Sequence, residues 1–184
     1  MGFHTFDPAM ADRLTDVSRF RFCSREELLG GLGVDTGGHL IDLGSGTGFY
    51  TSELAPFFDQ VSAVDIQAEM HDLYREDGVP DHVALVESST DSLPLADRSA
   101  DAAVSTMTVH ELPLEATLAE LARVLRPDSP VVVVDWSNAG RGEAGPPRDE
   151  RHDVAHVSEA FTDAGFTITQ ATERGETFVV RATR

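Results

Sequence analysis

The chain has 184 residues, 41% of them apolar, which suits one soluble globular domain. Its 32 acidic residues outnumber 14 basic ones, all arginine, for a formal net charge of −18, which argues against a nucleic-acid partner. No apolar run reaches the length of a membrane span, and the N-terminus lacks a signal-peptide pattern, so we expect a cytoplasmic protein without a membrane partner. Cys23 is the single cysteine, which excludes a disulfide framework and a cysteine-based metal cluster.

The excess of acidic residues also bears on the salt in which the protein works. An acidic surface keeps a protein hydrated where salt screening is extreme, and its self-repulsion destabilises the fold in dilute buffer. Codon bias alone could remove lysine, but it would not explain the number of acids. The composition resembles that of proteins from salt-loving cells.

Residues 1–38 precede the first predicted strand and form an expected N-terminal helical segment. Asp7 followed by Pro8 favours a short helix to about Arg19, and Ser24 with Glu27 forms a capping box for a helix that should stop at Gly30-Gly31. Aromatic and imidazole side chains here could close over a ligand as a lid or could strap the helices to the domain, and we favour the strap. They are His4, Phe6, Phe20 and Phe22.

The stretch HLIDLGSGTGFY, residues 39–50, reads as a buried strand, a glycine turn and the start of a helix. Gly44, Gly46 and Gly48 allow close backbone approach to a ligand, and the helix N–H groups point into the space they leave. A dinucleotide fingerprint needs its third glycine one residue later, where Phe49 stands, so the spacing argues against a nicotinamide-dependent reductase.

From here the pattern alternates short apolar strands with amphipathic helices, which predicts an α/β fold with a parallel sheet covered on both faces. Asp153 could cap a last helix ending at Gly165, and two final runs, 166–171 and 177–182, read as a hairpin. The long connection 137–151 is rich in Gly, Pro and charge. Other strands are predicted near 39–43, 61–65, 82–87, 101–106 and 131–136, and other helices near 48–58, 67–76 and 114–125.

Asp65 ends the second predicted strand, about twenty residues after the glycine turn. A carboxylate there can accept hydrogen bonds from two vicinal ribose hydroxyls. It could instead cap the next helix, and we favour the ribose role because of the turn before it.

The chain resembles a class I S-adenosylmethionine-dependent methyltransferase from His39 to Thr183. Five matching pieces occur in order and at the expected spacing. They are IDLGSGTG, AVDIQAEM, DSLPLADRSADAAVS, LARVLRPDSPVVVVDW and EAFTDAGF with the final hairpin. The resemblance implies a Rossmann-like, doubly wound, seven-stranded sheet of order 3-2-1-4-5-7-6 with its last strand antiparallel, in a cofactor-binding domain spanning 39–184.

The resemblance also implies a set of residues that bind S-adenosylmethionine. The first loop would hold the methionine end of the cofactor, Asp65 the ribose, and the third loop the adenine. Many members have an acid where Ser89 stands, so the adenine contact is the weakest part of the match. The implied cofactor-binding residues are Asp42, Gly44, Ser45, Gly46, Gly48, Asp65, Ile66, Ser89, Thr90, Thr106 and Met107.

The exit of the fourth predicted strand, residues 105–113, faces the transferring methyl group in this family. Methyl transfer requires alignment, exclusion of water and, for some acceptors, uptake of a proton. His110 is the candidate catalytic base with Glu111 as its orienter. A structural role for His110 in fixing the loop is an equal alternative.

A narrower resemblance, carried by HTFDP, VHEL, VVDW and the GPP loop, is to small methyltransferases of the ubiquinone/menaquinone-biosynthesis type. The candidate acceptor-binding residues are His4, Phe6, Trp136, Arg148 and Arg151. The other interpretation, which we slightly favour, is that Trp136 packs at the end of its strand and that the arginines pair with neighbouring acids. His152 and His156 have the spacing of metal ligands on a helix, but no third ligand is evident, and we predict no metal.

These patterns predict S-adenosylmethionine-dependent methyl transfer to a small-molecule acceptor. The 38 residues before the core and one loop leave little chain for docking a macromolecule. A non-catalytic S-adenosylmethionine-binding regulatory protein is the alternative, and it predicts cofactor binding without turnover. No oligomeric state is predicted.

Overall fold

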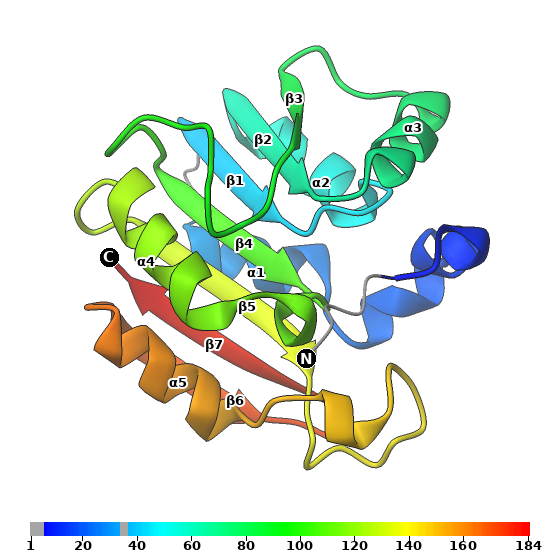
Figure 1. Cartoon of the computed structure of the whole chain (residues 1–184), viewed down its shortest axis with the longest axis vertical. Coiled ribbons are helices and arrows are strands. Elements are labelled where there is room, and N and C mark those ends of the chain that lie inside the picture. Colours follow the sequence, from blue (N-terminus) through cyan, green and yellow to red (C-terminus); the bar gives the residue numbers. More distant parts are fainter. Residues whose placement is uncertain (1–5, 34–36) are drawn as a thin grey trace.

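The computed structural model describes residues 6–33 and 37–184, and its centre is one seven-stranded sheet of order β3-β2-β1-β4-β5-β7-β6 (Figure 1). All strand pairs are parallel except those that β7 makes with β5 and β6. The predicted order and the antiparallel last strand are therefore confirmed. The strands are β1 His39–Leu43, β2 Gln60–Asp65, β3 Val83–Glu87, β4 Ala102–Thr106, β5 Pro130–Trp136, β6 Thr167–Glu173 and β7 Thr177–Thr183.

In the described part of the chain, five α-helices cover the two faces of the sheet, with α4 and α5 on the near side of Figure 1 and α1 and α2 on the far side. Among the described residues, none of the helices is long and apolar enough to cross a membrane. The helices are α1 Arg25–Leu32, α2 Phe49–Leu54, α3 Ala68–Asp77, α4 Leu114–Val124 and α5 Val154–Asp163. Short 3-10 helices are η1 Pro8–Leu14, η2 Val17–Arg21, η3 Ala55–Phe57, η4 Val109–Glu111 and η5 Arg148–Glu150.

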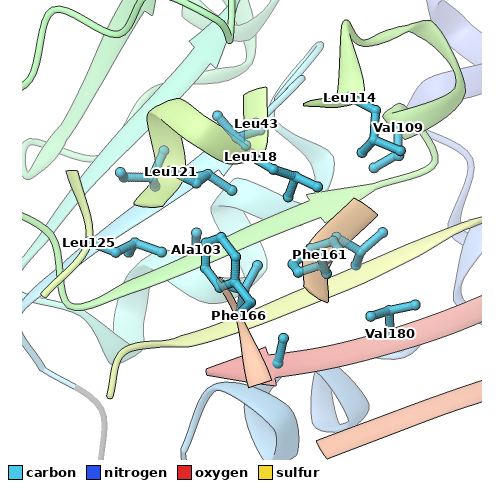
Figure 2. Packing of buried hydrophobic residues seen from close by; sticks show 14 of the residues in the cluster. Leu43, Ala103, Val109, Leu114, Leu118, Leu121, Leu125, Phe161, Phe166 and Val180 are labelled. Atoms are coloured by element: carbon cyan, nitrogen blue, oxygen red, sulfur yellow. The ribbon is translucent and has the colours of Figure 1, made fainter. Parts of the chain in front are cut away.

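The alternation of side chains along each strand divides the core in two. In β5, Val131 and Val133 join the cluster under α4 and α5, whereas Val132 and Val134 join the cluster under α1, α2 and α3. The first cluster also contains Phe161 and Phe166, whose rings pack edge to face with their centroids 5.3 Å apart (Figure 2). Because both faces are buried, the central strands are mostly apolar, as expected of a parallel sheet.

The N-terminal segment differs from its prediction. The expected single helix to Arg19 is two 3-10 helices, because Asp16 caps a new start by accepting a hydrogen bond from the Ser18 N–H at 2.8 Å. Helix α1 passes through Gly31 and ends before Gly33. Its close contact with the sheet explains the glycine, since a Cβ on Gly31 would lie 2.6 Å from Val132 Cγ2.

The predicted capping box at Ser24 forms only in part. The Ser24 hydroxyl accepts a hydrogen bond from the Glu27 N–H at 3.2 Å. The Glu27 carboxylate turns instead to Arg174, in the turn between β6 and β7, with which it forms an ion pair. Arg174 also donates to the Phe22 carbonyl at 3.1 Å, so this turn fastens the N-terminal segment to the sheet.

Candidate active site

A pocket opens at the carboxyl ends of β1, β2 and β4, where the strand order reverses between β1 and β4. This is the position at which open α/β sheets bind ligands, because loops leaving in opposite directions leave a crevice between them. Its floor comes from the strand-end loops 44–47, 65–67, 88–91 and 106–108. The N-terminal segment covers one side through Phe6, Leu14 and Arg19.

The glycine loop shapes the floor of this pocket. Gly44 and Gly46 have φ values of 70° and 54°, a region that favours glycine. A Cβ on Gly44 would lie 2.2 Å from Thr108 Cγ2, so the loop after β4 can close onto β1 only over a glycine. Gly46 faces Leu14, and a Cβ on Gly46 would lie in ordinary van der Waals contact with Leu14 Cδ1, at 3.7 Å. The loop therefore presents bare backbone to the pocket.

Thr47 provides a polar atom that the protein leaves without a partner. Its hydroxyl is buried in the pocket lining, and no described residue hydrogen-bonds to it. A buried hydroxyl without a partner costs free energy unless a ligand or water satisfies it. This atom and the bare glycine backbone fit a compact polar ligand group seated on the loop.

Two residues expected in the cofactor site lie beneath the pocket instead of lining it. Asp42 is buried, and its Oδ2 accepts a hydrogen bond from Thr51 Oγ1 at 2.6 Å. Burial raises the pKa of Asp42 to about 6. Gly48 packs against Tyr74, whose ring would lie 2.3 Å from a Cβ at Gly48. Both residues support the loop from below, because strand alternation and the start of α2 turn them away from the ligand space.

Asp65 lies in the pocket lining at the end of β2. Its Oδ2 accepts from the Gly46 N–H at 2.8 Å and its Oδ1 from the Gln67 N–H at 2.9 Å. Each carboxylate oxygen can accept a second hydrogen bond, so both remain able to receive a ligand hydroxyl. The two predicted roles are therefore compatible: Asp65 shapes the start of α3 and also faces the pocket.

Ile66, Ser89 and Thr90 also line the pocket, as expected for a ribose and adenine region. The side chain of Ile66 is available to a ligand, because the residue is 57% exposed despite being apolar. The Thr90 hydroxyl is already paired with Thr117 Oγ1 at 2.6 Å and buried. Of these two polar residues, Ser89 is the better placed for a ligand hydrogen bond.

Thr106 and Met107 line the pocket from the end of β4, as predicted, and Ser45 lines it from the glycine loop. Met107 has φ of 59°, an uncommon conformation for a residue other than glycine. Its N–H donates to the Val134 carbonyl at 2.7 Å, which holds this turn against β5. Such backbone strain at a pocket wall is typical of functional sites.

Arg19 is a pocket residue that the sequence analysis did not identify. Its guanidinium lies 5.3 Å from the ring centroids of both Phe49 and Tyr50, and it donates to the Leu14 carbonyl at 2.7 Å. Burial lowers the pKa of Arg19. It is the one basic side chain among the described residues of the pocket wall. The helix expected at this position gave no reason to single out one of several arginines.

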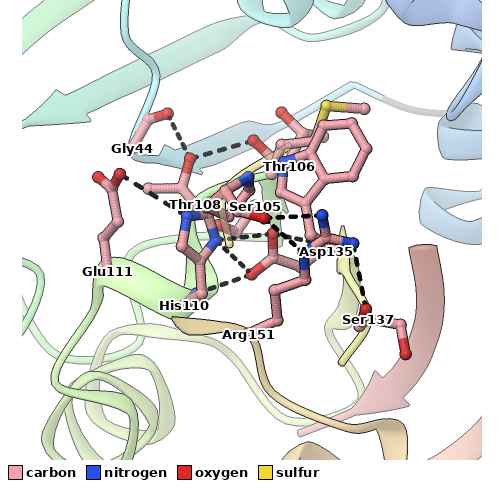
Figure 3. A network of polar contacts seen from close by, with 12 residues as sticks. Gly44, Ser105, Thr106, Thr108, His110, Glu111, Asp135, Ser137 and Arg151 are labelled. Carbon is pink, nitrogen blue, oxygen red and sulfur yellow. Dashed lines mark hydrogen bonds and ion pairs between the residues drawn. The ribbon is translucent and has the colours of Figure 1, made fainter. Parts of the chain in front are cut away.

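The predicted catalytic pair has a third member, Asp135 at the end of β5 (Figure 3). Asp135 is buried and lies 3.0 Å from His110 Nδ1 through its Oδ1, and its Oδ2 accepts from the His110 N–H at 2.7 Å. Glu111 Oε1 lies 3.7 Å from His110 Nε2. The residue that orients His110 is therefore Asp135 and not Glu111. The strand-end position that identified Asp65 could also have identified Asp135 in VVVVDW.

These contacts shift the pKa values of both predicted catalytic residues. Burial lowers the pKa of His110, but the charge of Asp135 and its hydrogen bond raise it more, so the net pKa is raised. Burial raises the pKa of Glu111 to about 7, against the opposing effect of the His110 charge. Glu111 can therefore change protonation state near neutral pH, and the charged form of His110 is favoured.

Two candidate acceptor-binding residues near the GPP loop, Trp136 and Arg151, make contacts that hold the fold together and do not reach the pocket. Trp136 is buried, with Phe22 edge-on at 4.7 Å. Arg151 is also buried, donates to the carbonyls of Pro146 and Ser137 and pairs with Glu176 at 3.3 Å. Neither residue lines the pocket, because both hold the 137–151 connection against β5 and β7.

Three other predicted residues have different outcomes. Arg148 is exposed and donates to the Asn138 carbonyl at 2.8 Å, away from the pocket, whereas Phe6 lines the pocket. His4 lies outside the described residues. The rings of His152 and His156 are tilted by 41° with centroids 4.9 Å apart, and no group of three potential metal ligands occurs within residues 6–33 and 37–184.

Comparison with known proteins identifies the family. A methyltransferase-domain family model matches residues 41–133, about half of the chain. A SAM-dependent methyltransferase of known structure from Aquifex aeolicus is 32% identical with a TM-score of 0.87, and the match covers 97% of this chain and 99% of that one. The chain belongs to this methyltransferase family.

Two curated relatives match over a smaller share of both chains. A demethylmenaquinone methyltransferase from Mycobacterium sp. is 33% identical over 114 residues, which are 61% of this chain and 48% of the relative. An uncharacterized methyltransferase from Mycobacterium tuberculosis is 36% identical over 112 residues, which are 61% of this chain and 41% of the relative. The chain spans less than half the length of these two relatives.

Proposed function

We propose that the protein transfers a methyl group from S-adenosylmethionine to a small-molecule acceptor. The observation that carries this proposal is the glycine loop at the switch point, with Asp65 facing the same pocket and the Thr47 hydroxyl buried without a protein partner. Membership of the methyltransferase family and the Aquifex aeolicus relative support the same cofactor. When bound, S-adenosylmethionine supplies an electrophilic methyl group on a sulfonium centre.

The residues of the pocket suit different parts of this cofactor. Asp65 would accept hydrogen bonds from the ribose hydroxyls, and the exposed side chain of Ile66 would cover an apolar face of the nucleoside. Arg19 would pair with the carboxylate of the methionine end, near the glycine loop and Thr47. Ser89 would flank the adenine.

A small acceptor fits the part of the pocket wall outside these contacts. Phe6 and Leu14 on one side and Leu112 and Pro113 on the other are apolar and come from short segments. Such walls exclude water from the transferring methyl group. The demethylmenaquinone methyltransferase relative supports a small-molecule acceptor of this kind.

The charge of the chain supports further proposals about where the protein works. The net charge of −18 supports an acidic surface adapted to concentrated salt and the absence of a nucleic-acid partner. The cytoplasmic location stays a prediction from the sequence.

Calorimetry in molar KCl tests the proposed cofactor. The protein should bind S-adenosylhomocysteine, the demethylated product, and release no heat with NADH. Heat from NADH and none from S-adenosylhomocysteine would contradict the methyltransferase proposal and support a nicotinamide-dependent enzyme.

A further inference from the structure

The side chain that reaches the pocket from η4 is Glu111, and His110 stands behind it. Glu111 belongs to the pocket lining, with 24% of its side chain exposed. The His110 side chain is 7% exposed and is absent from the described lining. A proton taken from a substrate in the pocket would therefore meet the Glu111 carboxylate first.

The position of His110 is fixed by Asp135, as Figure 3 shows. The Asp135 carboxylate lies 3.0 Å from Nδ1 and accepts from the backbone N–H groups of His110 and Trp136, at 2.7 and 2.8 Å. An ionised carboxylate only accepts hydrogen bonds, so Nδ1 carries a proton. The opposite ring nitrogen, Nε2, therefore exchanges protons on the side of Glu111, 3.7 Å away.

The charges around this pair allow one proton to lie on either group. Asp135, Glu111 and Glu150 face His110 and favour its charged form, while the neighbouring His152 adds an opposing positive influence. Glu111 faces His110, Asp135, Asp65 and Glu150. Removal of the His110 charge would leave Asp135, Asp65 and Glu150 to disfavour the ionised form of Glu111, which makes the two titrations interdependent.

We propose that Glu111 is the proton acceptor for a hydroxyl substrate. His110 and Asp135 are positioning residues, because Asp135 favours the charged form of His110 and that charge favours the ionised carboxylate of Glu111, the form that accepts the proton. This inference rests on the proposed methyl transfer and deepens it. The acceptor O–H bond breaks and its proton goes to the Glu111 carboxylate. A new O–CH₃ bond forms as the bond from carbon to sulfonium sulfur breaks, and that electron pair stays on sulfur. Ionised Glu111 and the sulfonium cation thus become a neutral acid and a neutral thioether.

The acceptor class follows from the need for a base. A thioether or tertiary amine attacks through a free electron pair and has no proton to lose. A phenol or alcohol becomes a good nucleophile only as its proton leaves. A partly buried carboxylate beside the β4 exit therefore fits an acceptor that loses a proton, and a neutral hydroxyl group is the acceptor in this proposal.

The first test follows the Glu111 carboxyl directly, without turnover. Carbon-13 NMR of glutamate labelled at Cδ should show one carboxyl that titrates near neutral pH, and the Glu111→Gln variant should lose this signal. In His110→Gln the same carboxyl should titrate at higher pH, because the histidine charge lowers its pKa. Titration of every glutamate below pH 5, or an unmoved titration in His110→Gln, would overturn the inference.

The second test uses turnover, followed as S-adenosylhomocysteine formation with a panel of phenols and alcohols and matched tertiary amines and thioethers. Glu111→Gln should slow methylation of hydroxyl probes by about 100-fold or more. The exposed Glu115, four residues further on, provides the matched control Glu115→Gln, which should keep the wild-type rate. Absence of turnover on every hydroxyl probe, or an unchanged rate in Glu111→Gln, would overturn the assignment.

Calorimetry separates this inference from the proposed function. Wild type should bind S-adenosylhomocysteine, and so should the control Glu115→Gln, because Glu115 lies outside the described pocket lining. Absence of binding in wild type would contradict the proposed cofactor itself. Intact binding in wild type, together with one of the overturning NMR or rate results, would contradict only the role of Glu111.

Discussion

At the scale of single residues, the two strand-end carboxylates show how contacts decide a role. Asp65 accepts two backbone N–H bonds at the pocket surface. Asp42 accepts one hydroxyl bond from Thr51, and its other oxygen has no partner among the described residues. Both are acids at the ends of neighbouring parallel strands, yet only Asp65 faces the ligand space. Asp42 is a source of pH-dependent stability.

Replacement of Asp42 by Asn should remove part of the dependence of stability on pH. Burial raises the pKa of Asp42 from 3.8 to about 6, so the folded state keeps a proton that the unfolded chain has lost. The stabilisation is complete below about pH 4 and is lost as pH rises through 6, a change of about 3 kcal/mol. Asn still accepts the Thr51 bond without ionising.

Urea unfolding in molar KCl at pH 4 and pH 7 measures this difference. Wild type should lose more free energy of unfolding between the two values than Asp42→Asn does. An equal loss in both proteins would contradict the assignment of a raised pKa to Asp42.

Some residues of the site could be predicted from the sequence and others could not. Asp65 is recognisable because a glycine turn precedes it at a known spacing, and its prediction as a pocket residue needed no structure. The partner of His110 is 25 residues away, and only the pairing of β4 with β5 brings Asp135 to it. Arg19 has no local motif at all, since its place in the pocket depends on the fold of the N-terminal segment.

At the scale of elements, the 137–151 connection is held by a buried arginine. Arg151 bonds the carbonyls of Pro146, Ala144 and Ser137 and pairs with Glu176 of the hairpin turn. The sequence shows only a loop with Gly, Pro and arginines, which fits a substrate grip equally well. The contacts in the structure show that Arg151 instead stabilises this loop.

Replacement of Arg151 by Ala should therefore reduce stability. The Glu176 carboxylate and several carbonyls would lose their partner in a buried place, which costs about 3 kcal/mol of the free energy of unfolding. Arg148→Ala, in the same loop but exposed, is the matched control and should cost less than about 1 kcal/mol. Chemical denaturation of both variants gives the comparison, and equal effects would contradict a structural role for Arg151.

The strands were predictable because short apolar runs such as β5 are separated by amphipathic helices. The family resemblance implied the strand order, which the structure confirms. Element ends were less predictable. Asp16 interrupts the first helix by a local cap, and Gly31 stays helical because α1 packs closely on β5.

At the scale of the whole molecule, the net charge of −18 should make stability depend strongly on salt. Repulsion among the acids destabilises the compact state, and added ions screen it. The melting temperature should rise from dilute buffer to molar KCl. The rise should be steepest at low salt, because the Debye length falls from about 30 Å at 0.01 M to about 10 Å at 0.1 M. Equal melting temperatures throughout would contradict adaptation to salt.

The central claim is that Asp65 and the glycine loop bind S-adenosylmethionine, and calorimetry of S-adenosylhomocysteine with Asp65→Asn tests it most directly. Asn keeps only one of the two acceptor oxygens, so Asp65→Asn can accept from only one of the Gly46 and Gln67 N–H groups and offers a ligand fewer acceptors. The variant should therefore lose about 10-fold or more in affinity. Asp59→Asn is the control and should bind as wild type does, because Asp59 is an exposed residue just before the amino end of β2, whereas the pocket lies at the carboxyl ends of the strands. Equal affinity in Asp65→Asn and wild type would contradict the account.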